Sequence, residues 1–233
     1  MLDAIGIIFA ATAIGVSLVA VAGTMVRQPQ RLALAAAAGA WIGVAAAIAG
    51  SGALARLPVL LATFALPLAA AAALTLLSGP ARAFLLAMPM PLLAGLNLFR
   101  VGGVLFVVLA SAGRLSGPFP YFAGWGDVMT GALAIPVALL AARGSPNADR
   151  LVAAWNAFGT LDLVVAVMLG VASREGSPLQ LIHAGVGSAA MTALPWALVP
   201  TVLVPFFLVL HASIFAQLRA RMPGNATRPL MAA

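Results

Sequence analysis

The chain has 233 residues, of which 64% are hydrophobic and 7% are charged. A soluble domain carries roughly 25% charged residues, so this composition excludes a water-soluble globular protein and makes the lipid bilayer the main partner. The formal charge is +7, but the arginines are scattered one or two to a loop, which argues against a nucleic-acid partner.

Continuous apolar runs follow one another along the chain. A spanning helix needs about 20 mostly apolar residues, whereas barrel strands would alternate apolar and polar residues. We predict an all-α, polytopic integral membrane protein with about seven transmembrane helices in one bundle, a single domain over residues 1–233. The expected helices cover residues 4–26, 32–54, 57–77, 90–112, 122–142, 151–172 and 196–218, and residues 219–233 are expected to form a mobile cytoplasmic tail.

The arginines predict how these helices are oriented. Cytoplasmic loops are rich in basic residues, so we expect a bacterial inner-membrane protein with its N-terminus outside and its C-terminus in the cytoplasm. Tyr121, Trp125 and Trp196 then fall at the outer interface. The cytoplasmic side holds Arg27, Arg31, Arg82, Arg143, Arg150, Arg219, Arg221 and Arg228, and the outer side holds Arg56, Arg114 and Arg174.

Two absent residue types limit the chemistry. Cysteine is absent, which removes disulfides, thiol nucleophiles and cysteine metal sites. Lysine is absent too, which excludes a retinal Schiff base. His211 and His183 are the only histidines and lie at different expected depths, so haem is disfavoured and no metal site or cofactor is predicted.

Four ionisable side chains lie inside the expected helices, where a charge costs at least about 2.5 kcal/mol and normally finds a partner. They are Arg100, Asp127, Asp162 and His211. Arg100 and Asp162 each lie roughly 15 Å into helices that run outward, so we predict an ion pair between them at mid-membrane. Asp127 is a rival partner, about 7 to 10 Å shallower by the same rise. It could instead cap the first turn of its helix.

Two asparagines extend this group toward the cytoplasmic side. Asn97 is three residues from Arg100 and shares its helix face, and Asn156 shares a broad side of its helix with Asp162. With His211 they form one polar stripe between the fourth to seventh helices. The first three helices carry few polar side chains and form a scaffold, or a wall that faces lipid or other membrane subunits.

A group of residues in the C-terminal half carries a family resemblance. They are Arg100 with Gly103, the segment FAGWGD at residues 122–127, Trp155-Asn156 with Gly159, Asp162-Leu163, and Pro200 and Pro205 followed by Leu210-His211. From Arg100 onward the sequence resembles uncharacterised bacterial seven-helix membrane proteins of unknown function. The resemblance implies no known chemistry and assigns no role to a residue.

Two functions fit these observations. The first is small-solute or proton-linked transport through the polar stripe, in which Arg100 contacts an anion or acts as a counter-ion, Asp162 carries charge or a proton, and His211 titrates. The alternative is a non-catalytic accessory or structural subunit of a larger membrane complex, with helices one to three as its contact wall. An intramembrane enzyme ranks third, because the chain lacks the usual hydrolase and zinc motifs. A purely structural role also stays open, since such polar groups often bridge helices.

Overall fold

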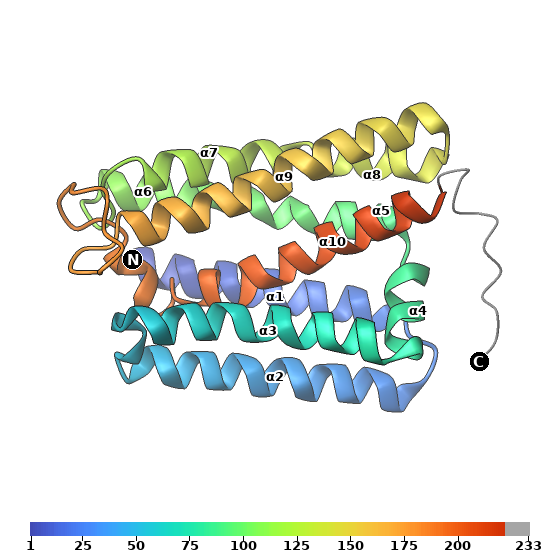
Figure 1. Cartoon of the computed structure of the whole chain (residues 1–233), viewed down its shortest axis with the longest axis horizontal. Helices are drawn as coiled ribbons and strands as arrows, with labels where there is room; N and C mark the ends of the chain where they lie inside the picture. Colours follow the sequence, from blue (N-terminus) through green and yellow to red (C-terminus); the bar gives the residue numbers. More distant parts are fainter. Residues whose placement is uncertain (222–233) are drawn as a thin grey trace.

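The long helices of this protein run roughly along one common axis (Figure 1). The computed structural model describes residues 1–221, and every regular element in that range is helical. Six helices are long and apolar enough to cross a membrane, and a bent helix pair adds a seventh if it forms one span. The N-terminus lies at the opposite end of the bundle from the last turn of the final helix (Figure 1). The all-α prediction is therefore confirmed, and several helices have the length and composition of membrane spans.

The first three helices differ from the expected ranges only at their ends. The first helix stops before residue 26 because Thr24 closes its last turn, donating its hydroxyl to the Val21 carbonyl at 2.7 Å. The second begins earlier than expected, with a proline in its first turn, and stops where Gly52 adopts a left-handed φ of 73°. These elements are α1 (Leu2–Gly23), α2 (Gln28–Gly50), the 3₁₀ turn η1 (Ala53–Ala55) and α3 (Leu57–Leu77).

The expected helix at residues 90–112 is not continuous. A 3₁₀ stretch separates two α-helical segments, and a short helix that the sequence did not suggest precedes them. Gly102 and Gly103 lie at the end of the 3₁₀ stretch, where their low helix propensity weakens a regular α-helix. These elements are α4 (Gly79–Ala87), α5 (Met90–Gly95), η2 (Leu96–Gly103) and α6 (Val104–Ser111).

The remaining helices start earlier or later than expected or are interrupted, and the last begins at Val199 rather than at residue 196. The fifth expected helix begins at Phe119 and bends by 41° before Pro136, whose missing N–H weakens the ladder. The sixth begins at Pro146, after Ser145 accepts the Ala148 N–H. The last opens with a π-helical turn and continues through Arg221, so residues 219–221 are helical and the rest of the expected tail lies outside the described residues. These elements are α7 (Phe119–Ala132), α8 (Ala134–Arg143), α9 (Pro146–Ala172), the 3₁₀ turn η3 (Ala189–Thr192), η4 (Val199–Leu203) and α10 (Val204–Arg221).

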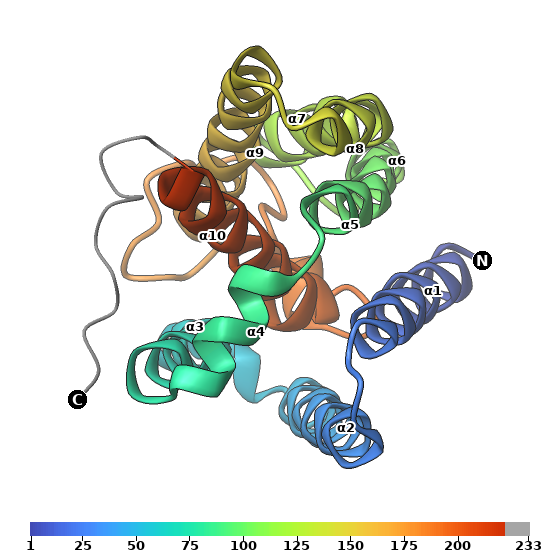
Figure 2. The same ribbon diagram turned by 90° about the vertical axis from the view of Figure 1, so that its right-hand side faces the viewer.

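Helix α10 occupies the middle of the bundle. In the end-on view it lies between α5 to α9 on one side and α1 to α3 on the other (Figure 2). It contacts α9, α5 and α3 directly, and its side chains Leu210 and Ile214 are buried with Leu93 and Val152. Polar side chains on the inner faces of η2, α7, α9 and α10 therefore meet in one interior.

The three aromatic residues expected at the outer interface do not behave alike. Tyr121 and Trp125 are about half exposed, as interfacial rings would be. Trp196 is buried at 2% exposure and donates its indole N–H to Asp3 at 2.8 Å. Asp3 also pairs with Arg114 at 2.6 Å. Trp196 therefore fixes the start of α1 and, unlike Tyr121 and Trp125, is not exposed.

Close packing of α1 on η2 depends on Gly102. A Cβ at this position would overlap the ring of Phe9, whereas a Cβ at Gly39 of α2 would meet nothing within 4 Å. We expect Gly102→Ala to lower stability by about 1 to 3 kcal/mol, because overpacking displaces α1. Gly39→Ala should be neutral or slightly stabilising, because alanine favours the helix. Equilibrium unfolding in mixed detergent micelles measures both, and equal stability of the two variants would contradict this packing.

Candidate functional site

Arg100 lies at the centre of a buried polar cluster. Its side chain is 0% exposed and projects from η2 between α7 and α9. Its Nε donates to Asp127 Oδ1 at 2.6 Å, and its Nη2 donates to Asp162 Oδ2 at 2.5 Å. The structure thus contains the ion pair expected between Arg100 and Asp162, and the rival partner Asp127 joins the same guanidinium.

His211 contacts the same guanidinium from α10. Arg100 Nη1 lies 2.9 Å from His211 Nε2 and also donates to the Gly159 carbonyl at 3.0 Å. A guanidinium has no acceptor atom, so His211 Nε2 must accept and the ring proton must lie on Nδ1. His211 Nδ1 then donates to Asn156 Oδ1 at 2.7 Å, and Asn156 Nδ2 donates to the His211 carbonyl at 3.0 Å. In this geometry His211 is therefore a neutral acceptor that orients Arg100.

Two of the expected polar residues have contacts that the sequence did not predict. Asp127 does not cap its helix: α7 begins at Phe119, eight residues earlier, which carries Asp127 roughly 12 Å inward to the depth of Arg100. Asn97 is fully buried but makes no hydrogen bond to this cluster within residues 1–221. Its amide donates to the Leu93 carbonyl at 3.0 Å, and its side-chain oxygen has no partner among the described residues.

Glycines allow the helices to meet around the guanidinium. A Cβ on Gly159 would lie 2.7 Å from His211 Cε1 and 3.0 Å from Arg100 Nη1. A Cβ on Gly126 would overlap the Asp162 carboxylate, so this carboxylate lies directly against α7. Substitution of either glycine would therefore separate the helices that carry the charged groups.

Two aromatic residues of the site were missed from the sequence. The Arg100 guanidinium carbon lies 6.0 Å from the centroid of the Phe207 ring, within the range of a cation–π contact. The Trp155 ring lies 5.7 Å from the His211 ring, and its indole N–H donates to the Thr130 carbonyl at 3.1 Å. Phe207 precedes His211 by four residues, so helical spacing could have placed both on one face.

Comparison with known proteins places this cluster within one family. A family model described as a domain of unknown function (DUF8737) matches residues 56–219. The chain belongs to this family. The matched segment contains η2, α7, α9 and nearly all of α10, and with them all the residues of the cluster. No curated protein and no solved structure matches the chain.

The charges of the cluster do not balance. Arg100 contributes one positive charge, Asp127 and Asp162 contribute two negative charges when ionised, and neutral His211 contributes none. Both ring nitrogens of His211 are already engaged, and within residues 1–221 no three His, Cys, Asp or Glu side chains are grouped to hold a metal ion. One carboxylate is therefore in excess and can bind a proton or another cation.

Removal of Arg100 should be the most damaging change in this cluster. Arg100→Leu leaves two buried carboxylates without a counter-charge, so we expect a loss of about 3 to 5 kcal/mol. Adding Asp127→Asn and Asp162→Asn to Arg100→Leu should restore part of that stability. As a control, Arg114→Leu breaks a half-exposed pair with Asp3 and should cost under about 1 kcal/mol. Unfolding in mixed micelles measures all of these, and additive losses in the triple variant would contradict the pairing.

The tautomer of His211 can be observed directly. The chain has two histidines, so nitrogen NMR of histidine-labelled protein should give two sets of ring signals. We expect one set to show a protonated Nδ1 and an unprotonated Nε2, and to disappear in His211→Gln. A protonated Nε2 on His211 would contradict the contact with Arg100, because that nitrogen could no longer accept.

Proposed function

We propose that the chain crosses the bacterial inner membrane seven times and carries a small solute across it in a proton-linked manner. Support for seven spans comes from the six long apolar helices and from the bent pair α7–α8 taken as one span. An odd number of spans agrees with the positions of the N-terminus and the end of α10 at opposite ends of the bundle (Figure 1). The excess of arginines on one side supports a cytoplasmic C-terminus.

The observation that carries the proton linkage is one buried guanidinium between two carboxylates. Their side chains are 0%, 15% and 8% exposed for Arg100, Asp127 and Asp162. An uncompensated charge in a poorly solvated interior is expensive and is normally neutralised. We infer that Asp127 and Asp162 share one exchangeable proton, held on a carboxylate oxygen that does not accept from Arg100.

The helices around this site support a moving part. Arg100 lies on the 3₁₀ stretch η2, α7 leads into the 41° bend at α8, and α10 is preceded by the π turn η4. Mid-helix 3₁₀ and π segments often mark hinges or functional sites, and interrupted helices line the binding sites of many carriers. A proton that changes which carboxylate pairs with Arg100 would therefore act on the irregular parts of these three helices, where movement is easiest.

A non-catalytic subunit of a larger membrane complex is the second proposal. In its favour, only 11% of the spanning window of α2 and 6% of that of α3 is buried, against 44% for the span at residues 90–111. These faces suit either lipid or another membrane subunit. Purification in mild detergent separates the two proposals, because a subunit would retain a constant partner and a carrier would run as a monomer or homo-oligomer.

The shared proton gives a specific infrared signature. The chain has five acidic side chains, which makes carboxyl bands assignable by substitution. At neutral pH we expect one protonated carboxyl band in the wild type. Either Asp127→Asn or Asp162→Asn alone should abolish it rather than halve it, because the remaining carboxylate then pairs one to one with Arg100.

Asp149→Asn is the matched control, because Asp149 forms a surface pair with Arg221 outside the cluster. This variant should leave the band unchanged. A wild-type protein with every carboxyl ionised at neutral pH would refute the proton site.

A further inference from the structure

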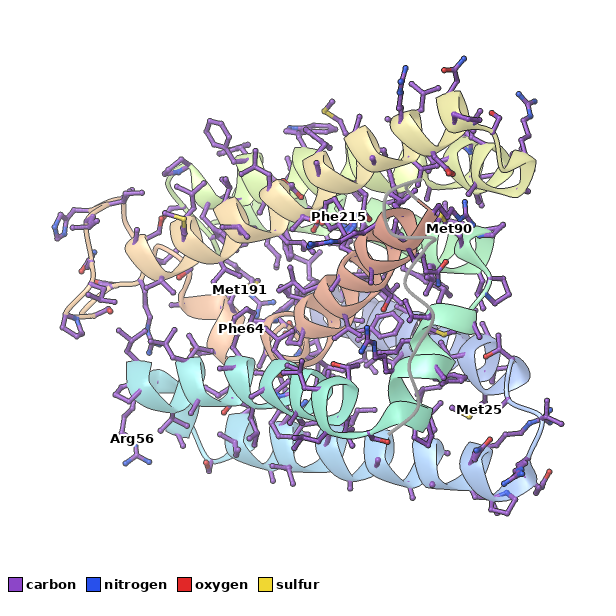
Figure 3. All side chains as sticks on the ribbon, turned by 45° about the vertical axis from the view of Figure 1, so that its right-hand side comes forward. Met25, Arg56, Phe64, Met90, Met191 and Phe215 are labelled. Atoms are coloured by element: carbon purple, nitrogen blue, oxygen red, sulfur yellow. The ribbon has the colours of Figure 1, made fainter. Side chains whose placement is uncertain are left out.

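A cavity reaches one of the two carboxylates from the side of α3. It has a volume of about 80 Å³ and lies between α3, α9 and the junction of η4 with α10. Phe64 and Met191 lie on its wall, in the space between α3 and α9 (Figure 3). Leu60, Ala166 and Val167 add further apolar surface. The wall therefore suits an apolar molecule rather than a hydrated ion.

Asp127 is the charged residue that lines this cavity. Its Oδ1 is engaged by Arg100, and its Oδ2 accepts no hydrogen bond from any of residues 1–221. The hydroxyls of Ser188 and Thr192 also line the cavity but donate to the backbone carbonyls of Gly170 and Ala189. Asp127 thus lines the cavity and keeps one carboxylate oxygen that no side chain within residues 1–221 engages.

Asp162 lines a different hollow, a wider and more open groove of about 460 Å³. Its carboxylate lies against the backbone of α7, where a Cβ on Gly126 would overlap it. The groove beside it is shallow and is bordered by Trp125 and Phe158, which are 52% and 39% exposed. Of the two carboxylates, Asp127 is therefore the one that lines the more enclosed apolar space.

We propose that this cavity binds an apolar molecule with an ammonium head, whose N–H groups donate to Asp127 Oδ2. The charged and titratable groups around Asp127 are Arg100 from η2, Asp162 from α9 and, beyond Arg100, neutral His211 from α10. Together they hold one negative charge in excess, which a monovalent cation neutralises. An anionic head would meet the carboxylates, and a neutral head would leave the excess charge in place.

This inference rests on the proposed proton-linked function and names its substrate class. Because cation and proton neutralise the same excess charge, each bound ammonium should displace one proton from the aspartate pair. The N–H groups of the ammonium then form the contact with Asp127, while Arg100 stays paired with Asp162. Because the ammonium and the proton exchange at one site, their transport is coupled in opposite directions across the membrane.

Equilibrium dialysis of the full chain in detergent tests the site. The probes are radiolabelled n-octylammonium, n-octanol and n-octanoate, which share one chain and differ in charge. The cavity is partly open, so the end of the octyl chain extends beyond it. We expect the wild type to bind octylammonium roughly tenfold more tightly than Asp127→Asn does, the scale of one charge-assisted hydrogen bond. Octanol and octanoate should bind equally to the two proteins. Because each probe enters the detergent micelles to the same extent with either protein, the comparison between proteins removes the contribution of the micelles.

Cavity-filling variants separate the cavity from the carboxylate. Ala166→Phe should abolish octylammonium binding and keep the protonated carboxyl band, while Ala132→Phe, on an exposed face of α7, should change neither. Val167→Phe repeats the test on the same wall if Ala166→Phe does not fold.

Two results would overturn the ammonium site: equal binding by wild type and Asp127→Asn, or binding retained when the cavity is filled. Binding without release of a proton into unbuffered solution would keep the ammonium site and refute the proton linkage.

Discussion

The arrangement of this bundle depends on one buried guanidinium, whose N–H groups must be satisfied by protein acceptors. Arg100 has five N–H groups and a permanent charge, and it lies on a helix surrounded by apolar side chains. Four of the five N–H groups are satisfied by Asp127, Asp162, His211 and the Gly159 carbonyl, which come from α7, α9 and α10. These contacts tie three helices to η2 at one depth and fix the register of each.

Small residues make these contacts geometrically accessible. Gly103 and Gly124 face each other where η2 crosses α7, and Gly131 lies against the backbone of η2 at Val101. Close approach of backbones is a common way for membrane helices to gain packing energy, because lipid supplies no hydrophobic drive between them. Here it also shortens the distance that each charged side chain must cover. The polar cluster and the glycine packing therefore depend on each other.

Much of this site could be predicted from the sequence, because the cost of charge in a bilayer selects few residues. Arg100, Asp162 and His211 were identified by that cost, and residue counting placed Arg100 and Asp162 at one depth. Counting failed for Asp127 because the start of α7 depends on Pro120, which fits a first turn although it reads as a loop residue. The contact of Phe207 with Arg100 depends on how α10 packs against η2, which the spacing of Phe207 and His211 within one helix does not give.

The second carboxylate is what distinguishes this cluster from a structural ion pair. A single aspartate would neutralise Arg100 and leave no net charge in the membrane. Charge balance therefore requires only one of Asp127 and Asp162. Buried ion pairs already contribute little net stability after desolvation, and an additional carboxylate makes the interior less favourable unless it binds a cation. A group that only becomes favourable when it holds an exchangeable ligand is suited to function rather than to folding. Its position beside an apolar cavity, with one oxygen free, gives that ligand a place to bind.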